Sequence, residues 1–168
     1  MIIRTGGNKM PQKLSVFKTH ILLFLLLCVA AGVLFAFTLE EYWNKIQYEN
    51  TYLELPVSSV FLYIFCVLSY LLQGLAFGIV AEHPQKKMYE TAVLLFWAQF
   101  VLGLLWLGIF FGLRFFGTAL FDLFTAFILL TLTFSTFRKI DLLSAYMLVP
   151  YGCLLIFVGA LNIWFFLV

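Results

Sequence analysis

Apolar residues in this 168-residue chain come in long unbroken stretches rather than in the alternating pattern of exposed strands. The stretches predict five helices over residues 19–39, 56–81, 90–113, 115–137 and 142–167. Each stretch is long enough to cross a hydrocarbon core of about 30 Å at about 1.5 Å per residue. Strands of a membrane barrel would instead alternate over about ten residues. The pattern therefore predicts an all-α integral membrane protein, a five-transmembrane-helix bundle that forms one domain over residues 1–168.

Composition agrees with a chain that lies in a membrane. Hydrophobic residues make up 64% of it and charged residues 11%, whereas a soluble domain is about half apolar and about a quarter charged. A chain of this size cannot bury so much apolar surface within itself, so a water-soluble monomer is excluded. The net charge of +2 is too small to indicate nucleic acid binding. The lipid bilayer is the expected surrounding, and no nucleic acid partner is expected.

The basic residues predict how the chain is oriented in the membrane. Two of the predicted connections, around Lys45 and Arg114, carry one basic residue each, and the other side of the bundle carries more. The residues on that richer side are Arg4, Lys9, Lys13, Lys18, Lys86, Lys87, Arg138 and Lys139. The positive-inside rule then predicts a multi-pass protein of the cell membrane with a cytoplasmic N-terminus. The apolar part of 19–39 is too long for a signal peptide, so it is interpreted as a retained helix.

The usual signs of metal or catalytic chemistry are missing from the sequence. Cys28, Cys66 and Cys153 stand singly in apolar stretches, which indicates neither a disulfide framework nor a metal site. His20 and His83 fall at a helix edge and in a connection, where interfacial residues are expected. No nucleophile–base motif, zinc-protease motif or phosphate-binding glycine loop occurs. We therefore predict no cofactor and no enzymatic activity.

Two helical stripes are candidates for a binding slot. Residues three and four apart lie on one face of a helix. The stripe of the third span consists of Gln99, Gly103, Trp106 and Phe110, and that of the last span of Tyr151, Leu154, Val158 and Asn162. If the stripes face each other, they form an aromatic-walled slot that suits a flat, mostly apolar ligand. The alternative is that both are helix-packing surfaces with no cavity.

Polar, proline and glycine residues inside the spans allow further predictions. Asp122 is either a proton or ion relay or, as we favour, a buried carboxylate paired with Arg114 or hydrogen-bonded between helices. Gln99 and Asn162 either hydrogen-bond across helices or contact a ligand. Pro150 should bend the last helix, because it lacks a backbone N–H. The glycine pairs allow close helix packing, and they are Gly74 with Gly78 and Gly108 with Gly112.

The second half of the chain resembles the TspO/MBR family, the tryptophan-rich sensory or translocator proteins. The family's third-helix pattern and the stretch after it are matched by Gln99, Trp106, Phe110, Phe111, Gly112, Ala119, Leu120 and Asp122. Its fifth-helix pattern is matched by Leu148, Pro150, Tyr151, Phe157, Leu161 and Asn162. The first half fits more loosely, through the proline-containing segment 56–61 and through Tyr70, Gly74 and Ala76.

The resemblance implies a five-helix fold and a flat hydrophobic ligand that is porphyrin-like, tetrapyrrole or sterol-like, with haem included as a ligand rather than a cofactor. The ligand-binding residues it suggests, together with the two stripes, are Pro56, Phe61, Tyr70, Gln99, Gly103, Trp106, Phe110, Tyr151, Leu154, Phe157, Val158 and Asn162. It also implies a homodimer, for which the Gly108 and Gly112 face is one candidate surface. The first loop, 38–56, would act as a lid.

Departures from the family pattern affect the ligand more than the fold. Pocket positions that are asparagine and tryptophan in the family are Gly103 and Leu154 here, and the tryptophan of the second helix falls on Phe65 or Cys66. The expected function is a membrane binding protein or sensor, with sequestration or handover of its ligand. Two alternatives stay open, namely a small transporter of such a ligand and a structural membrane protein that has lost ligand binding.

Overall fold

The computed structural model describes residues 22, 24–41 and 59–167 of the chain. The first described helix is Phe24–Glu41. The elements that follow are α2 (Ser59–Ala81), α3 (Tyr89–Leu107), the π-helix η1 (Gly108–Leu113), α4 (Phe116–Ile140), α5 (Leu142–Tyr146) and α6 (Val149–Leu167). No strand occurs in these ranges. The predicted lid 38–56 and the basic residues before the first helix fall largely or wholly outside the described residues.

Five spans are long and apolar enough to cross a membrane, which confirms the predicted fold class. The fourth helix runs on to Ile140, three residues past its predicted end. Arg138 and Lys139 were expected to end it, but they occupy its last turn. Basic side chains are favourable there because the C-terminus of a helix carries partial negative charge, and their long stems reach the interface.

The last span is interrupted near its start. α5 ends at Tyr146, and α6 begins at Val149 directly before Pro150. The backbone N–H of Leu148 donates a hydrogen bond of 3.1 Å to the Ala145 carbonyl. This carbonyl is three residues earlier, as in a 3₁₀-helix, and not four residues earlier as in an α-helix. A proline cannot donate to the carbonyl four residues earlier and its ring crowds that position, so the bend predicted at Pro150 is confirmed.

The third span widens into a π-helix over its last six residues, which the sequence pattern did not predict. Arg114 ends it in the left-handed backbone conformation, with φ 57°. The N–H groups of Arg114 and Phe115 both turn back to the Ile109 carbonyl, and this closes the connection to α4. Short π-helical segments frequently occur at functional sites in helices.

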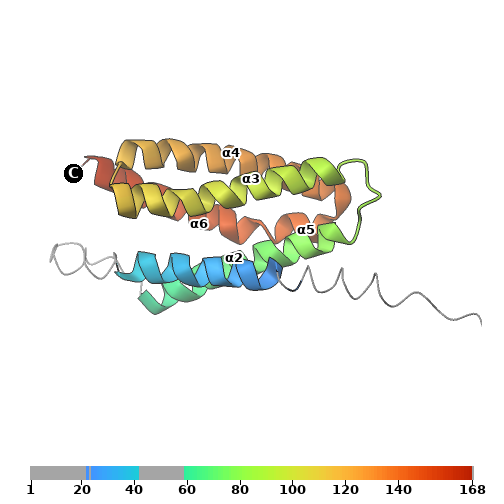
Figure 1. Ribbon diagram of the computed structural model, residues 1–168, viewed down its shortest axis with the longest axis horizontal. Coiled ribbons are helices and arrows are strands. Elements are labelled where there is room, and N and C mark those ends of the chain that lie inside the picture. Colours follow the sequence, from blue (N-terminus) through green and yellow to red (C-terminus); the bar gives the residue numbers. More distant parts are fainter. Residues whose placement is uncertain (1–21, 23, 42–58, 168) are drawn as a thin grey trace, which may run out of the picture.

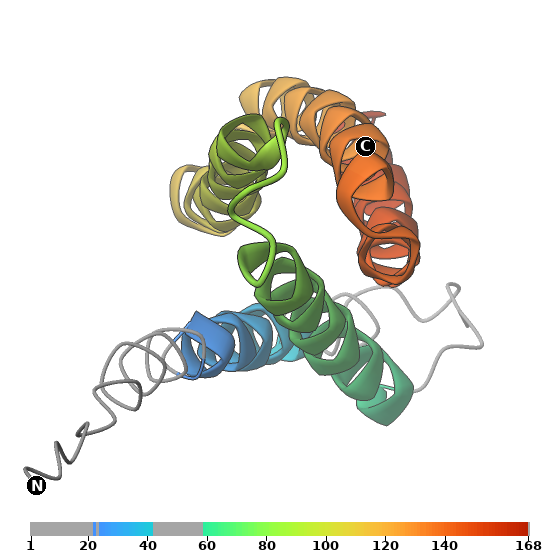
Figure 2. The same ribbon diagram turned by 90° about the vertical axis from the view of Figure 1, so that its right-hand side faces the viewer.

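The spans run up and down, and the connection 82–88 lies at the end opposite the turn at Arg114 (Figure 1). α4 is packed between α3 on one side and α5 and α6 on the other, while α2 contacts both α3 and α6. The first helix, coloured blue, lies against α2 and crosses it at an angle (Figures 1 and 2). α2, α3 and α6 therefore enclose the interior of the bundle, and the first helix adds to it from the side of α2.

Two glycines set the distance between the first helix and α2. A Cβ at Gly32 would lie 2.8 Å from the Tyr70 Cβ and 3.3 Å from the Val67 Cα. A Cβ at Gly74 would lie 3.0 Å from the Cys28 Cβ. At each glycine, a residue of the opposite helix packs against the glycine backbone. The two helices thus approach closely, as small residues allow in membranes. Gly108 and Gly112 differ, because a Cβ there would meet nothing within 4 Å.

We expect Gly32→Ala to destabilise the bundle by about 1–3 kcal/mol, because the added methyl group must displace the backbone of α2. The measurement is thermal unfolding of the detergent-solubilised protein. Gly108→Ala is the matched control and should leave stability unchanged or slightly raised, since it adds helix propensity in open space. Equal melting temperatures for the two variants would contradict the packing described here.

Candidate functional site

The stripe predicted on the third span faces the interior of the bundle. Gln99 and Gly103 on α3, Trp106 near its end and Phe110 in η1 are all buried. The ring of Trp106 stacks on that of Phe110, with centroids 4.8 Å apart. The π-helical winding thus leaves the phenylalanine on the same buried face as the tryptophan.

The stripe predicted on the last span is buried as well. Tyr151, Leu154, Val158 and Asn162 are all inward-facing residues of α6. The bend before Pro150 sets the direction of this helix, so Tyr151 is the first of its side chains to reach the interior. Cys66 and Leu154 are buried and Phe65 is half-buried, so these three positions lie in or beside this interior.

The two stripes face each other and touch at two levels. The hydroxyl of Tyr151 lies over Gly103, where a Cβ would overlap it. Toward the Arg114 end, the indole nitrogen of Trp106 lies 3.2 Å from the side-chain oxygen of Asn162, with the amide oriented to accept from it. The space that glycine leaves on α3 is therefore filled by a tyrosine of α6.

The first helix and α2 supply a third wall of rings. Phe35 stacks on Trp106 with centroids 5.7 Å apart and an interplanar angle of 22°. The ring centroid of Tyr70, on α2, lies 5.7 Å from that of Phe35 and 5.4 Å from that of Tyr151. Phe35 was not among the predicted residues, although the sequence holds a signal for it: Phe24, Cys28, Ala31, Phe35 and Leu39 are buried at spacings of four, three, four and four along one face.

Several buried polar atoms between these walls have no hydrogen-bond partner within the described chain. They include the hydroxyl oxygens of Tyr70 and Tyr151 and both amide atoms of Gln73 and Gln99. Tyr70 and Tyr151 are adjacent through their rings, and both hydroxyls lie within 4 Å of the position of a Cβ at Gly103. Unpaired polar groups are costly in a membrane interior. We therefore take this group, the interior polar cluster, as the candidate site.

Gln73 was not among the predicted residues, yet its position brings it level with Gln99. The ring pairs Phe77 with Phe96, 4.7 Å apart, and Tyr70 with Phe100, 6.2 Å apart, fix the antiparallel register of α2 and α3. In this register Gln73 and Gln99 fall at the same height. The sequence signal for Gln73 is a glutamine that lies one turn from Tyr70 in an otherwise apolar span.

Asn162 joins three helices and uses its whole amide to do so. In the orientation that satisfies its neighbours, its nitrogen donates to the Phe116 carbonyl at 2.9 Å. Its oxygen accepts from the Leu120 N–H at 3.1 Å and from Trp106. Of the two roles that the sequence left open, the geometry therefore supports the interhelical one for Asn162.

Asp122 is buried in α4, with 7% of its surface exposed, but it is not paired as expected. Arg114 is exposed, and the favoured ion pair does not form within the described part of the chain. One carboxylate oxygen, Oδ2, has no hydrogen-bond partner there. The burial of the Asp122 carboxylate is therefore confirmed, whereas its ion pair with Arg114 is wrong, because Arg114 ends η1 with its side chain exposed.

Two of the predicted site residues do not belong to the interior group. Phe61 lies on the outer face of α2, is 62% exposed and stacks on Phe65 with centroids 6.1 Å apart. Phe157 is half-buried on α6. Pro56 lies outside the described residues, so its role stays a prediction.

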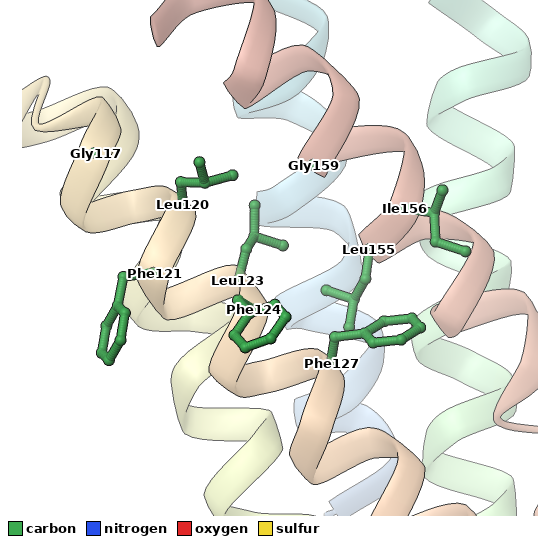
Figure 3. Close-up of a pocket in the computed structure, with 9 residues that line it drawn as sticks. All are labelled: Gly117, Leu120, Phe121, Leu123, Phe124, Phe127, Leu155, Ile156 and Gly159. Atoms are coloured by element: carbon green, nitrogen blue, oxygen red, sulfur yellow. The ribbon is translucent and has the colours of Figure 1, made fainter.

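Open hollows occur elsewhere, along the outer seam between α4 and α6. The larger measures about 560 Å³ and is lined by Phe121, Phe124, Leu155 and Gly159, among others (Figure 3). The smaller, about 290 Å³, continues from it because both are bordered by Phe127 and Ile156. No sequence pattern had indicated this seam.

Fold and site together define a polytopic helical membrane protein with an aromatic interior that contains unpaired polar groups. Residues 21–167 match the TspO/MBR family, so the chain belongs to that family. Membership makes it a membrane sensor or binding protein of the family's kind. A comparison with curated proteins finds no match.

We expect Asn162→Leu to destabilise the protein by about 1–3 kcal/mol, because it leaves the Trp106 indole N–H without its partner in the apolar interior. Unfolding of the purified protein with increasing denaturant in mixed micelles measures the effect. Ser135→Ala serves as the control, since the Ser135 hydroxyl is exposed and bonds only to the Thr131 carbonyl of its own helix. A leucine variant as stable as the control would refute the interhelical role.

Proposed function

We propose that the chain is a membrane-embedded binding protein and sensor for a flat, mostly apolar ligand of the tetrapyrrole or sterol kind. The single observation that carries this proposal is the interior polar cluster, whose hydroxyl and amide groups lie among aromatic rings and find no hydrogen-bond partner within residues 24–41 and 59–167. A purely structural core would gain stability from apolar residues of similar shape at these positions. A ligand with a few polar substituents and a flat apolar body would satisfy both kinds of surface.

The aromatic residues around the cluster suit stacking on a planar molecule. Phe35 and Trp106 are nearly parallel, and Tyr70 and Tyr151 present ring edges and hydroxyls beside them. Aromatic pairs of this kind contribute about 0.5–1.5 kcal/mol each beyond the area they bury. A porphyrin would be recognised here through its ring and its carboxylates, with Tyr70, Tyr151, Gln73 and Gln99 as the polar partners.

Ligand access requires side chains to move. In this structure the Tyr151 hydroxyl covers Gly103, and Phe35 covers Trp106. We propose that the ligand displaces Tyr151 from Gly103 and enters between the first helix and α3. The same close contact favours the structural alternative, in which the seam stays closed and nothing binds. Sequestration and handover of the ligand require no chemical conversion, so no catalytic residue is proposed.

We expect protoporphyrin IX to bind the detergent-solubilised protein saturably, with a shift of its absorption band. Trp106→Leu should weaken this binding about tenfold, which corresponds to the loss of about 1.4 kcal/mol of stacking. Trp164→Leu is the matched control and should change the affinity less than twofold, because Trp164 is 46% exposed on the outside of α6. An absorption change that rises linearly with porphyrin concentration and does not saturate for the unmodified protein would refute the porphyrin hypothesis.

The Tyr151→Phe variant distinguishes a role of the Tyr151 hydroxyl in ligand binding from a role in stability. Removing an unpaired buried hydroxyl should keep or raise the melting temperature. If the hydroxyl serves a ligand, the same variant should bind protoporphyrin IX several-fold more weakly. Unchanged affinity together with raised stability would instead favour the structural alternative. Movement of the porphyrin across proteoliposome membranes would distinguish a transporter from a binder.

We propose that the protein lies in the cell membrane with its N-terminus in the cytoplasm, since the basic connection 82–88 and the end of α4 lie at one end of the bundle. A cysteine placed at Lys87 should then resist a membrane-impermeant thiol reagent in intact cells and react after lysis. A cysteine at Arg114 should react in intact cells. The reverse labelling pattern would overturn this orientation. Cys153 lies within a span and gives the background.

A further inference from the structure

The outer seam between α4 and α6 forms a lengthwise groove that is separate from the interior polar cluster. α4 and α6 touch where a Cβ at Gly117 would meet the Phe166 ring at 3.3 Å, and where a Cβ at Gly152 would meet the Leu130 side chain at 3.3 Å. Between these contacts the larger hollow opens, and beyond Phe127 the smaller one continues toward the end of α4. Figure 3 shows phenylalanines of α4 and residues of α6 on the two sides of the larger hollow.

The groove lies in the part of the molecule that the hydrocarbon of a membrane surrounds. α4 and α6 are both parts of membrane spans, and Phe121, Phe124 and Ile156 are largely exposed. A Cβ at Gly159 would meet nothing within 4 Å, so this part of the groove lies open to its surroundings. The surface therefore fits an elongated apolar chain rather than a polar molecule.

The groove leads to a positive charge. Phe127, Thr131, Phe134 and Arg138 follow one another at spacings of four, three and four, so they lie on one face of α4. The first three line the smaller hollow, and Arg138 follows one turn beyond them with Lys139 beside it. Both basic residues are exposed, and neither forms an ion pair within the described ranges.

The distances fit a lipid of a single leaflet. Arg138 follows Phe127 by eleven positions, which corresponds to about 16.5 Å along the helix. Half of a hydrocarbon core is about 15 Å thick. A phosphate at Arg138 would thus place the end of its acyl chain near Phe127 and Ile156, where the two hollows meet.

We propose that this groove is a binding site for an anionic glycerophospholipid, with its phosphate at Arg138 and Lys139 and one acyl chain along the smaller hollow. Because one end of the groove is positively charged, the groove favours an anionic lipid over an uncharged lipid. The same charge disfavours a helix of a second copy of the chain, because such a helix would require an apolar face along the whole seam. The site is independent of the interior polar cluster, since its lining residues lie on the other side of α4 and α6.

The test is native mass spectrometry of the full-length protein, delipidated in detergent and titrated with dioleoyl phosphatidylglycerol or dioleoyl phosphatidylcholine. These lipids share their tails, so the difference in affinity reports on the headgroup. We expect the anionic lipid to bind more tightly and Arg138→Gln to weaken it about fivefold, the factor expected for one basic residue at a membrane surface. Lys87→Gln, at the same end but on the α2–α3 connection, should leave the affinity unchanged.

A second variant tests the acyl-chain groove. Cys153→Phe fills the smaller hollow from its exposed side and should lower the affinity for both lipids. Ile64→Phe adds a similar ring on the exposed face of α2, which lines neither hollow, and should have no effect. Equal binding of the two lipids with no effect of Arg138→Gln would overturn the proposal. So would a dimer that Cys153→Phe disrupts, because the groove would then be a contact between copies.

Discussion

The structure depends above all on the cost of leaving polar groups unpaired where no water is present. Helical spans satisfy the hydrogen-bonding groups of their own backbone, and buried serine and threonine hydroxyls in them bond to that backbone as well. The hydroxyls of Ser69, Thr133 and Thr136 each bond to the carbonyl four residues earlier, at 2.7 Å. The side-chain amide of Asn162 forms three hydrogen bonds with groups of α3 and α4. Against this background the unpaired tyrosines and glutamines of the interior stand out.

Those exceptions share a geometric cause. Tyrosine and glutamine side chains extend too far from the backbone to bond to their own helix, so they need a partner on another element. In the interior, Tyr70 and Tyr151 meet ring to edge, and the Tyr151 hydroxyl lies over Gly103. Glycine at this position makes room for the hydroxyl but offers it no side-chain partner. Gly103, one of several positions that the sequence analysis interpreted as departures from the family pattern, thus lies at the contact that closes the interior.

Inner and outer faces of the last helices follow different physical rules. The interior brings together rings and polar atoms, and its close contacts are made by Gly103, Trp106 and Asn162. The outer seam is nearly all apolar, and its hollows lie open to the hydrocarbon of the membrane. A flat molecule with polar substituents suits the first, and a flexible acyl chain suits the second. One bundle of five spans therefore offers two surfaces that differ in both shape and polarity.

Local features of the chain determined three things: the long apolar stretches determined the number of spans, the spacing of three and four residues determined the inward faces of the third and last helices, and Pro150 determined the bend. Only the tertiary structure decided which side chains meet. The Tyr151 hydroxyl at Gly103, the Phe35 ring on Trp106 and the exposure of Phe61 depend on the register between helices. That register is set by close contacts such as Gly32 on Tyr70, between residues far apart in the chain. Their pairing is a property of the packed bundle, and no single helix contains it.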